Sequence, residues 1–160
     1  MTYPYLMGKF SAGILMYRLR GGEAEVLIVH PGGPFWAKKD IGAWSIPKGE
    51  YLAGQDPLET ARREFREELG SDVAGPFIGL KPVRQAGGKL VTAFAVEGDF
   101  DTSTLESNTF EMEWPPRSGR MKEFPVVDRA EWFALATARE KLNPTQATLV
   151  DQLAPLIDAD

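Results

Sequence analysis

The chain of 160 residues contains no cysteine and only one histidine, His30. Without cysteine, disulfide bonds, thiolate zinc sites and cysteine nucleophiles are all excluded. A single histidine excludes a histidine-rich metal site, and a Ser-His-Asp triad would have to use His30. No hydrophobic run approaches the roughly 18 residues that a transmembrane helix requires. Candidate sites are therefore limited to those built without thiols or paired imidazoles.

The composition is that of an ordinary globular protein, with 43% hydrophobic and 26% charged residues. The length suits one domain spanning residues 1–160. The formal net charge of -5 argues against bulk binding of nucleic acid or of an anionic membrane, but it does not exclude a local basic patch. The start, MTYPYLMGKF, lacks the basic and apolar regions of a signal peptide. We expect a cytoplasmic domain with no membrane and no stable nucleic-acid partner.

Residues 47–71, PKGEYLAGQDPLETARREFREELGS, predict a loop that leads into one helix over 57–69. Asp56 suits the N-cap and Pro57 the first helical position. Gly70 then provides the C-terminal stop. At about 100° per residue, one apolar stripe of this helix should face a core. The members of the stripe are Leu58, Ala61, Phe65 and Leu69.

Three glutamates, Glu64, Glu67 and Glu68, follow one flank of this helix. Glu64 and Glu68 are four residues apart and stack beside the apolar stripe, with Glu68 at the core boundary. An acid there is costly unless it is paired or bound to metal, and close carboxylates repel one another. A hard divalent cation such as Mg²⁺ or Mn²⁺ resolves both problems because it takes oxygen ligands. The other interpretation is a solvated helix with salt bridges such as Arg63 to Glu67.

The stretch resembles the Nudix box, which in that family reads G, five residues, E, seven residues, R-E-U-x-E-E-x-G-U, where U is a bulky aliphatic residue. Gly49 matches the first glycine, and the second half matches in register. Three positions depart from the pattern, because Gln55 replaces a glutamate, Ser71 replaces an aliphatic residue and Phe65 is aromatic. The matched second half consists of Arg63, Glu64, Phe65, Glu67, Glu68 and Gly70.

The resemblance implies a Nudix-like α/β/α sandwich, an α/β fold in which helices cover both faces of a mixed sheet. It also implies a hydrolase dependent on Mg²⁺ (or Mn²⁺) that cleaves a phosphoanhydride bond by attack of a metal-bound water. The substrate would be a nucleoside diphosphate linked to another group. The metal would be held by Glu64, Glu67 and Glu68 together with the backbone carbonyl of Lys48. Arg63 would position the glutamates.

Substrate-binding candidates come from the start of the box and from the preceding loop, residues 31–43. An aromatic side chain in that loop can stack on a base, and lysines can meet phosphates. The alternative is an ordinary loop whose tryptophan packs on the domain. His30, at the end of a strand, is more typical of a structural residue. The substrate-binding candidates are Trp36, Lys38, Lys39, Lys48 and Gly49.

One further acid is sought later in the chain, because Nudix enzymes often use such a residue as a ligand or general base. Glu111 and Glu113 share one side of an extended segment by their spacing of two. Glu113 is preferred because it adjoins a bend at Pro115 and Pro116, while both acids can also be surface residues. The proton acceptor can equally be a box glutamate. The catalytic candidates are Glu64, Glu67, Arg63 and Glu113.

Other elements follow from apolar runs and turn residues. Gly21 and Gly22 join two predicted strands into an antiparallel hairpin, and Pro82 demotes a later strand to an edge or bulge. Asp128 is expected to cap a helix running to about Lys141. The strands are expected at 8–19, 24–30, 44–46, 77–85 and 89–96, and the last helix at 145–157.

The substrate itself is left open by the sequence. The start of the box, PKGE, and the preceding Trp44 resemble the diadenosine polyphosphate hydrolase branch. Other branches cleanse oxidised nucleoside triphosphates, cleave ADP-ribose or remove RNA 5′ pyrophosphate, and net acidity disfavours the last. A nucleotide-binding regulatory domain without catalysis is the non-enzymatic alternative. Gln55 keeps this alternative open because it replaces the first glutamate of the box. Many members of the family form homodimers, although no interface is readable in the sequence.

Overall fold

The computed structural model describes residues 10–157 and contains a mixed sheet of seven strands with order β4-β6-β1-β2-β9. β3 also pairs with β1, and β5 pairs with β6. The pair β1–β6 is parallel and the other pairs of this sheet are antiparallel. The strands are β1 (Phe10–Arg20), β2 (Glu23–Pro31), β3 (Lys48–Tyr51), β4 (Ile78–Gly79), β5 (Val83–Arg84), β6 (Leu90–Glu97) and β9 (Val127–Ala134).

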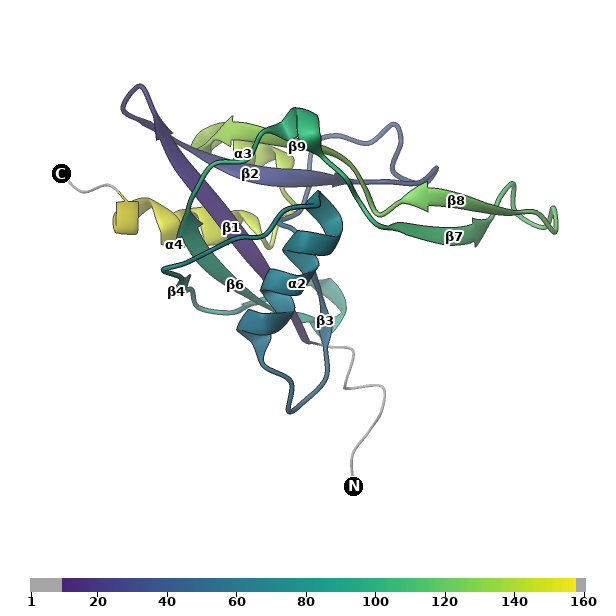
Figure 1. The fold of residues 1–160 in the computed structure, drawn as a ribbon, viewed down its shortest axis with the longest axis horizontal. Coiled ribbons are helices and arrows are strands. Elements are labelled where there is room, and N and C mark those ends of the chain that lie inside the picture. The colour runs from purple at the N-terminus through teal and green to yellow at the C-terminus, as the bar shows by residue number, and fades with distance from the viewer. Residues whose placement is uncertain (1–9, 158–160) are drawn as a thin grey trace.

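Helices cover both faces of this sheet (Figure 1). The helices are α2 (Pro57–Leu69), α3 (Leu135–Lys141) and α4 (Ala147–Ile157), with short 3₁₀ turns η1 (Ala86–Gly88) and η2 (Thr102–Thr104). A separate hairpin of β7 (Thr109–Glu113) and β8 (Met121–Pro125) projects from the body. Within residues 10–157, no helix is long and apolar enough to cross a membrane.

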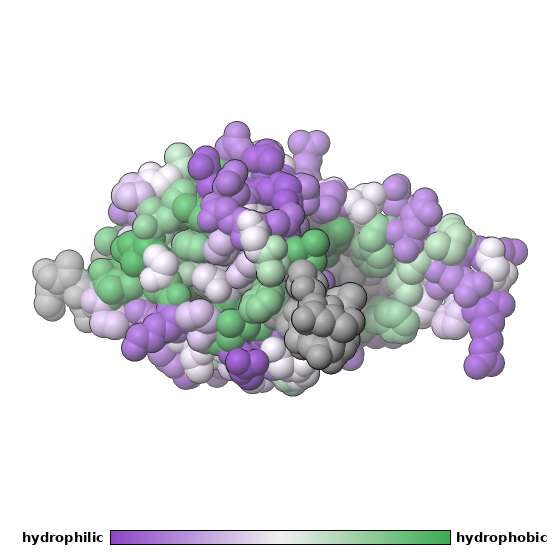
Figure 2. All heavy atoms as spheres, turned by 90° about the horizontal axis from the view of Figure 1, so that it is seen from below, coloured by the Kyte–Doolittle hydropathy of each residue, from purple (hydrophilic) through white to green (hydrophobic). Residues whose placement is uncertain are grey.

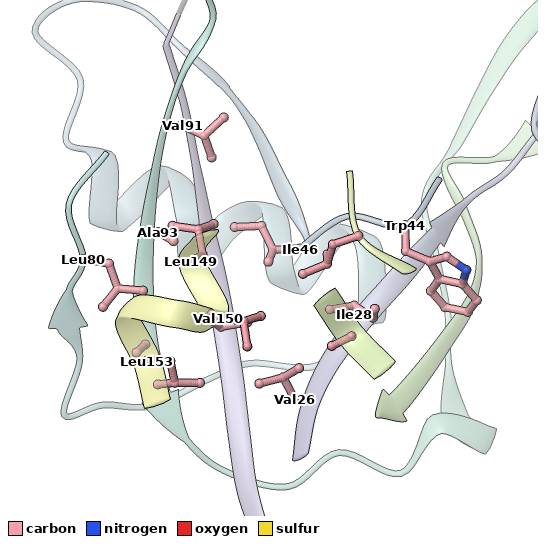
Figure 3. Close-up of a cluster of buried hydrophobic side chains, with 14 residues drawn as sticks. Val26, Ile28, Trp44, Ile46, Leu80, Val91, Ala93, Leu149, Val150 and Leu153 are labelled. Atoms are coloured by element: carbon pink, nitrogen blue, oxygen red, sulfur yellow. The ribbon is translucent and has the colours of Figure 1, made fainter. Parts of the chain in front are cut away.

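Alternation along the central strands separates two hydrophobic cores. Ile14 and Met16 of β1 face α2, while Leu15 between them faces α3 and α4. Figure 3 shows the core on the side of α3 and α4, where Leu149 and Leu153 of α4 lie beside strand residues. The expected α/β fold with helices on both faces of a mixed sheet is confirmed.

The first predicted hairpin is confirmed, because β1 and β2 pair in antiparallel fashion around Gly21 and Gly22. Both glycines adopt positive φ, at 62° and 85°, as a tight hairpin turn requires. The start of the expected strand, residues 8–9, lies outside the described residues. The expected strand over 77–85 is divided into β4 and β5 on either side of Pro82, which has no N–H to donate.

The prediction of a helix capped by Asp128 is wrong. Residues 127–134 form β9, which pairs with β2, and the helix α3 begins only at Leu135. As a strand, the segment places Trp132 against the core under α2 and Phe133 against the opposite core. Burial on both faces of the sheet therefore outweighs the local capping signal. Asp128 Oδ1 instead lies 2.8 Å from His30 Nδ1, within hydrogen-bond distance.

Two further segments differ in detail from the expectation. Trp44 and Ser45 form isolated bridges to Leu142 and Val29 rather than a strand over 44–46. The extended segment that carries Glu111 and Glu113 is β7, as expected, and β8 returns along it to form a hairpin over residues 109–125. Trp44 is fully buried, as expected.

Gln146 links the last helical region to the segment that enters the box. Its buried side chain accepts from the Ile46 backbone N–H at 2.9 Å and donates to Ser45 Oγ and Gln85 Oε1. Gln146→Leu is expected to lower the free energy of unfolding by about 2 to 3 kcal/mol, because it leaves these buried groups unpaired. Urea denaturation monitored by tryptophan fluorescence measures the loss.

The control is Gln152→Leu on α4, which begins directly after Gln146; the Gln152 side chain bonds the exposed main chain of Lys81 at 2.6 and 2.9 Å. Water replaces those contacts, so a loss of about 1 kcal/mol or less is expected. Equal losses in the two variants would contradict a special role for Gln146.

Candidate active site

Gly49 lies directly against the carboxylate of Glu64. A Cβ atom at position 49 would lie 2.1 Å from Glu64 Cδ and 2.3 Å from Oε2. β3 carries Gly49 beside Ala12 of β1, and α2 packs against both strands. Only a residue without a side chain allows this approach, which is the physical reason for a glycine at the start of the box.

The helix α2 forms as its local signals predict. Asp56 Oδ2 accepts from the Glu59 backbone N–H at 3.1 Å, and Pro57 occupies the first turn. Gly70 ends the helix at φ 83° and donates to the carbonyl of Arg66. Ala61, Phe65 and Leu69 are buried, and Leu58 is half-buried. The apolar stripe therefore fixes how the helix presents its acidic flank.

Glu68 is buried with 5% of its surface exposed, as its position beside the apolar stripe predicts. Burial, followed by the adjacent Glu64 as the second cause, raises the pKa of the Glu68 carboxyl to about 9. Lys48 opposes the rise. Two carboxyl groups thus meet where water is largely excluded, an arrangement that disfavours two negative charges without a nearby cation.

Lys48 stands at the same place on β3 and is half-buried. Burial lowers the pKa of its ammonium group, and neighbouring Lys89 lowers this pKa as well. Glu68, Glu50 and Glu64 act in the opposite direction. Lys48 therefore brings a positive charge to the Glu64–Glu68 pair through its side chain, a contribution that sequence reasoning missed.

Arg63 contacts two of the helix glutamates. Its Nη2 lies 3.2 Å from Glu64 Oε2 and its Nε lies 3.7 Å from Glu67 Oε2. Within residues 10–157, no three Asp, Glu or His side chains converge closely enough to make a preformed ion site. The donor set nevertheless fits a hard divalent cation, because Glu64 and Glu68 meet in a buried place and supply oxygen ligands.

A pocket of about 190 Å³ adjoins Glu68 and Lys48. Its other walls include apolar side chains from β2 and from the start of β9. Apolar walls with a few charged groups are typical of small-molecule sites. Val126 and Val127 were missed by sequence analysis, where the apolar pair after Pro125 was the available signal. The remaining lining residues are Val29, Pro31, Ser45, Ile46, Val126 and Val127.

Within the described residues 10–157, no hydrogen bond or ion pair joins the loop candidates Trp36, Lys38 and Lys39 to the box glutamates. Trp36 is 40% exposed, and Lys39 Nζ lies 5.2 Å from the centre of its ring. Lys38 is exposed, and the carbonyl of Lys39 lies 2.6 Å from His30 Nε2. His30 is itself buried between this carbonyl and Asp128, which fits a structural role for its ring. Substrate binding by Trp36, Lys38 and Lys39 stays a prediction.

The structure does not bring Glu113 to the helix glutamates. Glu113 ends β7 on the projecting hairpin, which is the extension at the right of Figure 2. Its Oε2 accepts from the Gly119 backbone N–H at 2.7 Å and so closes the turn of the hairpin. Glu111 is exposed and pairs with Glu123 in the β7–β8 register.

Gln55 closes the loop before α2. Its Oε1 accepts from the Leu52 backbone N–H at 2.7 Å, and its own N–H donates to the carbonyl of Leu52 at 3.0 Å. The residue is exposed. In the described structure Gln55 therefore supports the loop without entering the Glu64–Glu68 pair.

The site thus combines a glycine-led loop and a glutamate-bearing helix in a mixed sheet covered by helices on both faces. The NUDIX domain model matches residues 9–153. The chain belongs to the NUDIX family. The fold is similar to that of Ap4A hydrolase from C. elegans in a binary complex, with a TM-score of 0.65 and 16% identity, over 94% of this chain and 99% of that chain.

A second solved structure is the NUDIX domain of Shewanella oneidensis NrtR complexed with ADP ribose. Its TM-score is 0.61 at 16% identity, over 92% of this chain and 87% of that chain. At these identities the two structures show the fold alone.

Two curated relatives match different lengths of the chain. An octanoyltransferase of Myxococcus xanthus is 29% identical over 132 residues, which are 82% of this chain and 32% of that protein. An RNA pyrophosphohydrolase of Gluconacetobacter diazotrophicus is 43% identical over 51 residues, 32% of this chain and 28% of that protein. The chain therefore spans about a third or less of the curated relatives that it matches.

Proposed function

We propose that this protein is a divalent-metal-dependent hydrolase that cleaves a phosphoanhydride bond in a nucleoside diphosphate linked to another group. The observation that carries the proposal is the buried Glu64–Glu68 pair, set against Gly49 and beside Lys48. Family membership supports the same reaction class. A merely solvated Glu/Arg helix would not bury Glu68 to 5% exposure.

Glu64, Glu67 and Glu68 would hold Mg²⁺ or Mn²⁺, with the carbonyl of Lys48 as a further ligand. A bound ion would neutralise charge on phosphate oxygens and activate water. Arg63 positions Glu64 and Glu67 by contacting both. The Lys48 ammonium adds positive charge that suits an anionic phosphate chain.

A helix glutamate is the better candidate for the proton acceptor. Glu67 is 42% exposed and can reach water, whereas Glu113 is engaged in the hairpin turn. A base must lie within hydrogen-bond reach of the proton that it takes. We therefore assign Glu67 this role ahead of Glu113.

Dinucleoside polyphosphates or related nucleotides are the favoured substrates. The box start at Pro47 to Glu50, together with Trp44, supports this branch by resemblance. Nucleoside triphosphates and ADP-ribose are the alternatives, and the RNA pyrophosphohydrolase match adds a fourth substrate to test. We expect the protein to act in the cytoplasm on small nucleotides.

A regulatory domain that binds nucleotide without turnover is the second candidate. The observation that favours it is Gln55 at the position of the first box glutamate. Against it stand the three helix carboxylates, Glu64, Glu67 and Glu68, one of which is buried at a cost that binding alone does not require.

The test is phosphate release, coupled to a phosphatase where the product requires it. The panel contains diadenosine tetraphosphate, ADP-ribose, normal and oxidised deoxynucleoside triphosphates and a 5′-triphosphorylated RNA. Each compound is assayed with Mg²⁺, Mn²⁺ and EDTA. The variants are Glu67→Gln and, as a matched control on the same helix, Glu59→Gln, whose side chain is exposed.

Metal-dependent turnover of one compound is expected, with at least about a 100-fold loss in Glu67→Gln and less than about a twofold change in Glu59→Gln. Tight binding of a nucleotide without turnover in any metal would instead establish the regulatory candidate. Turnover that is unaffected by EDTA would overturn the metal-dependent reaction.

A further inference from the structure

We propose that the pocket beside Glu68 and Lys48 holds the base of the nucleotide substrate without distinguishing one base from another. This inference rests on the proposed hydrolase function and narrows its substrates to those chosen by the phosphate chain. A protein of this kind does not separate oxidised from normal nucleotides, so the cleansing of oxidised nucleotides is excluded as its activity. The walls of the pocket have already used their hydrogen-bond donors within the fold.

The main-chain N–H groups on one part of the pocket wall are paired inside the protein. Val29 and Ser45 exchange both of their main-chain hydrogen bonds, at 2.8 and 2.9 Å. The N–H of Ile46 donates to the buried side chain of Gln146 at 2.9 Å. None of these three N–H groups is therefore free to donate to a ligand.

Another part of the wall comes from the end of β2 and the start of β9. The Val126 N–H donates to the carbonyl of Asn108 at 2.9 Å. The Val127 N–H donates to Ser107 Oγ, also at 2.9 Å. Pro31 has no N–H to offer. This part of the wall therefore presents side chains and carbonyl groups to the pocket, and no donor.

The one hydroxyl group of the wall is committed in the same way. Ser45 Oγ donates to the Ile46 carbonyl at 2.6 Å and accepts from Gln146 Nε2 at 3.1 Å. The backbone N–H of Lys48 donates to the Glu68 carboxyl group. With a metal ion held by Glu68, the donor left for a ligand among these described residues is the Lys48 ammonium group.

Walls of this kind suit the base better than any other part of a nucleotide. Phosphates and ribose hydroxyls need hydrogen-bond partners, and burying them unpaired is costly. A base has two apolar faces on which valine side chains can pack. At about 190 Å³ the pocket is smaller than the roughly 300 to 1,000 Å³ of sites that enclose a whole small-molecule ligand, so it takes one part of the substrate.

Discrimination between bases requires that their polar edges be paired. A site that hydrogen-bonds a substrate group rejects an analogue without that group by about 10⁴- to 10⁵-fold, whereas a hydrophobic pocket separates similar shapes only weakly. Guanine, oxidised guanine and uracil carry oxygen atoms that accept hydrogen bonds, and the described wall residues have no donor for them. The polar edge of the base therefore faces the open side of the pocket and water, whichever base is bound.

The first experiment measures binding to the whole protein by isothermal titration calorimetry with Mg²⁺. The ligands are the α,β-methylene diphosphates of adenosine, guanosine, cytidine and uridine, whose bridging carbon prevents hydrolysis. Methylenediphosphonate, which has the same two phosphorus groups and no base, is the reference. The variant Val126→Phe narrows the pocket, and the control Val83→Phe changes a half-buried valine of β5 outside it.

We expect the four nucleotides to bind the wild type within about tenfold of one another, and each at least about tenfold more tightly than methylenediphosphonate. Val126→Phe is expected to weaken all four by at least about tenfold and to leave methylenediphosphonate within about twofold, while Val83→Phe changes neither class. Circular dichroism checks that the variants are folded, and the comparison of bases in the wild type does not depend on them.

Three results would overturn the proposal. The first is a preference of tenfold or more for one base. The second is a set of nucleotides that bind no more tightly than methylenediphosphonate. The third is a folded Val126→Phe protein that weakens both classes of ligand alike or neither of them.

Oxidised and normal nucleotides are compared as competitors of the adenosine ligand. The inhibition constants of dGTP and 8-oxo-dGTP are expected to agree within about tenfold, and a larger difference would contradict the assignment. Turnover of diadenosine, diguanosine and diuridine tetraphosphate then separates this inference from the proposed function. Values of kcat/KM within about tenfold of one another support both. No turnover of any compound counts against the hydrolase alone, because the binding series decides whether the base is distinguished.

Discussion

Glu68→Gln is expected to stabilise the metal-free protein at pH 8 and to abolish its hydrolase activity. The buried Glu68 carboxyl has a pKa raised to about 9 from its ordinary value of 4.5. The stability that the protonated Glu68 contributes is fully present below about pH 4.5 and is lost as the pH rises toward 9. Glutamine has nearly the shape of the protonated acid but does not titrate.

The expected gain at pH 8 is about 2 to 4 kcal/mol, or roughly 5 to 10 °C in melting temperature, and it should vanish near pH 4. Melting curves in EDTA across this pH range measure it. Added Mg²⁺ or Mn²⁺ should raise the melting temperature of the wild type and leave the variant unchanged, because the variant lacks an anionic ligand.

Glu59→Gln is again the matched control, since its exposed side chain on α2 is expected to change neither quantity. A Glu68→Gln protein less stable than the wild type at pH 8 in EDTA would show that the carboxylate is satisfied as an anion. That result would remove the main argument for a cation at this place.

Gly49→Ala is expected to lower turnover by at least about 100-fold while changing stability little. The new Cβ atom would meet the end of the Glu64 side chain at 2.1 Å, and that side chain is flexible enough to rotate away. The helix and strand can therefore keep their packing, while Glu64 leaves Glu68 and Arg63. Steady-state kinetics and thermal melting, measured on the same preparation, separate the two effects.

Gly79→Ala provides the control for an added methyl group. A Cβ there would lie 3.7 Å from Phe94, an ordinary contact, so both activity and melting temperature should be preserved. Full activity in Gly49→Ala would mean that the position of Glu64 does not matter for the reaction. A large fall in melting temperature would mean that the Glu64 side chain cannot move away without disturbing the packing of α2 against β3.

The box helix shows how much local sequence can determine. Asp56, Pro57 and Gly70 act through bonds within a few residues, so the bounds of α2 follow from the sequence alone. The period of the apolar residues then dictates that Glu68 falls at the core boundary. Burial of Glu68, the close fit at Gly49 and the mixed α/β fold were accordingly open to prediction or implied by the family resemblance.

The segment after β8 shows the opposite case. Asp128 carries a good capping side chain, yet its partner is His30, 98 positions earlier in the chain. The strand β9 is stabilised by β2 and by two separate cores, none of which is visible in a local window. The β7–β8 hairpin, which places Glu113 away from the helix glutamates, depends in the same way on a strand pairing that the local sequence does not predict.

The helix, its caps, its acidic flank and the glycine before it could be predicted from local sequence, because those signals act over one or two turns of chain. Three other features depend on the tertiary structure: Lys48 joins the glutamates through its side chain, Gln146 supports the entry to the box, and β9 ends the strand order beside β2. Those facts depend on which distant segments pack together, and burial of both sheet faces outweighs local preference there.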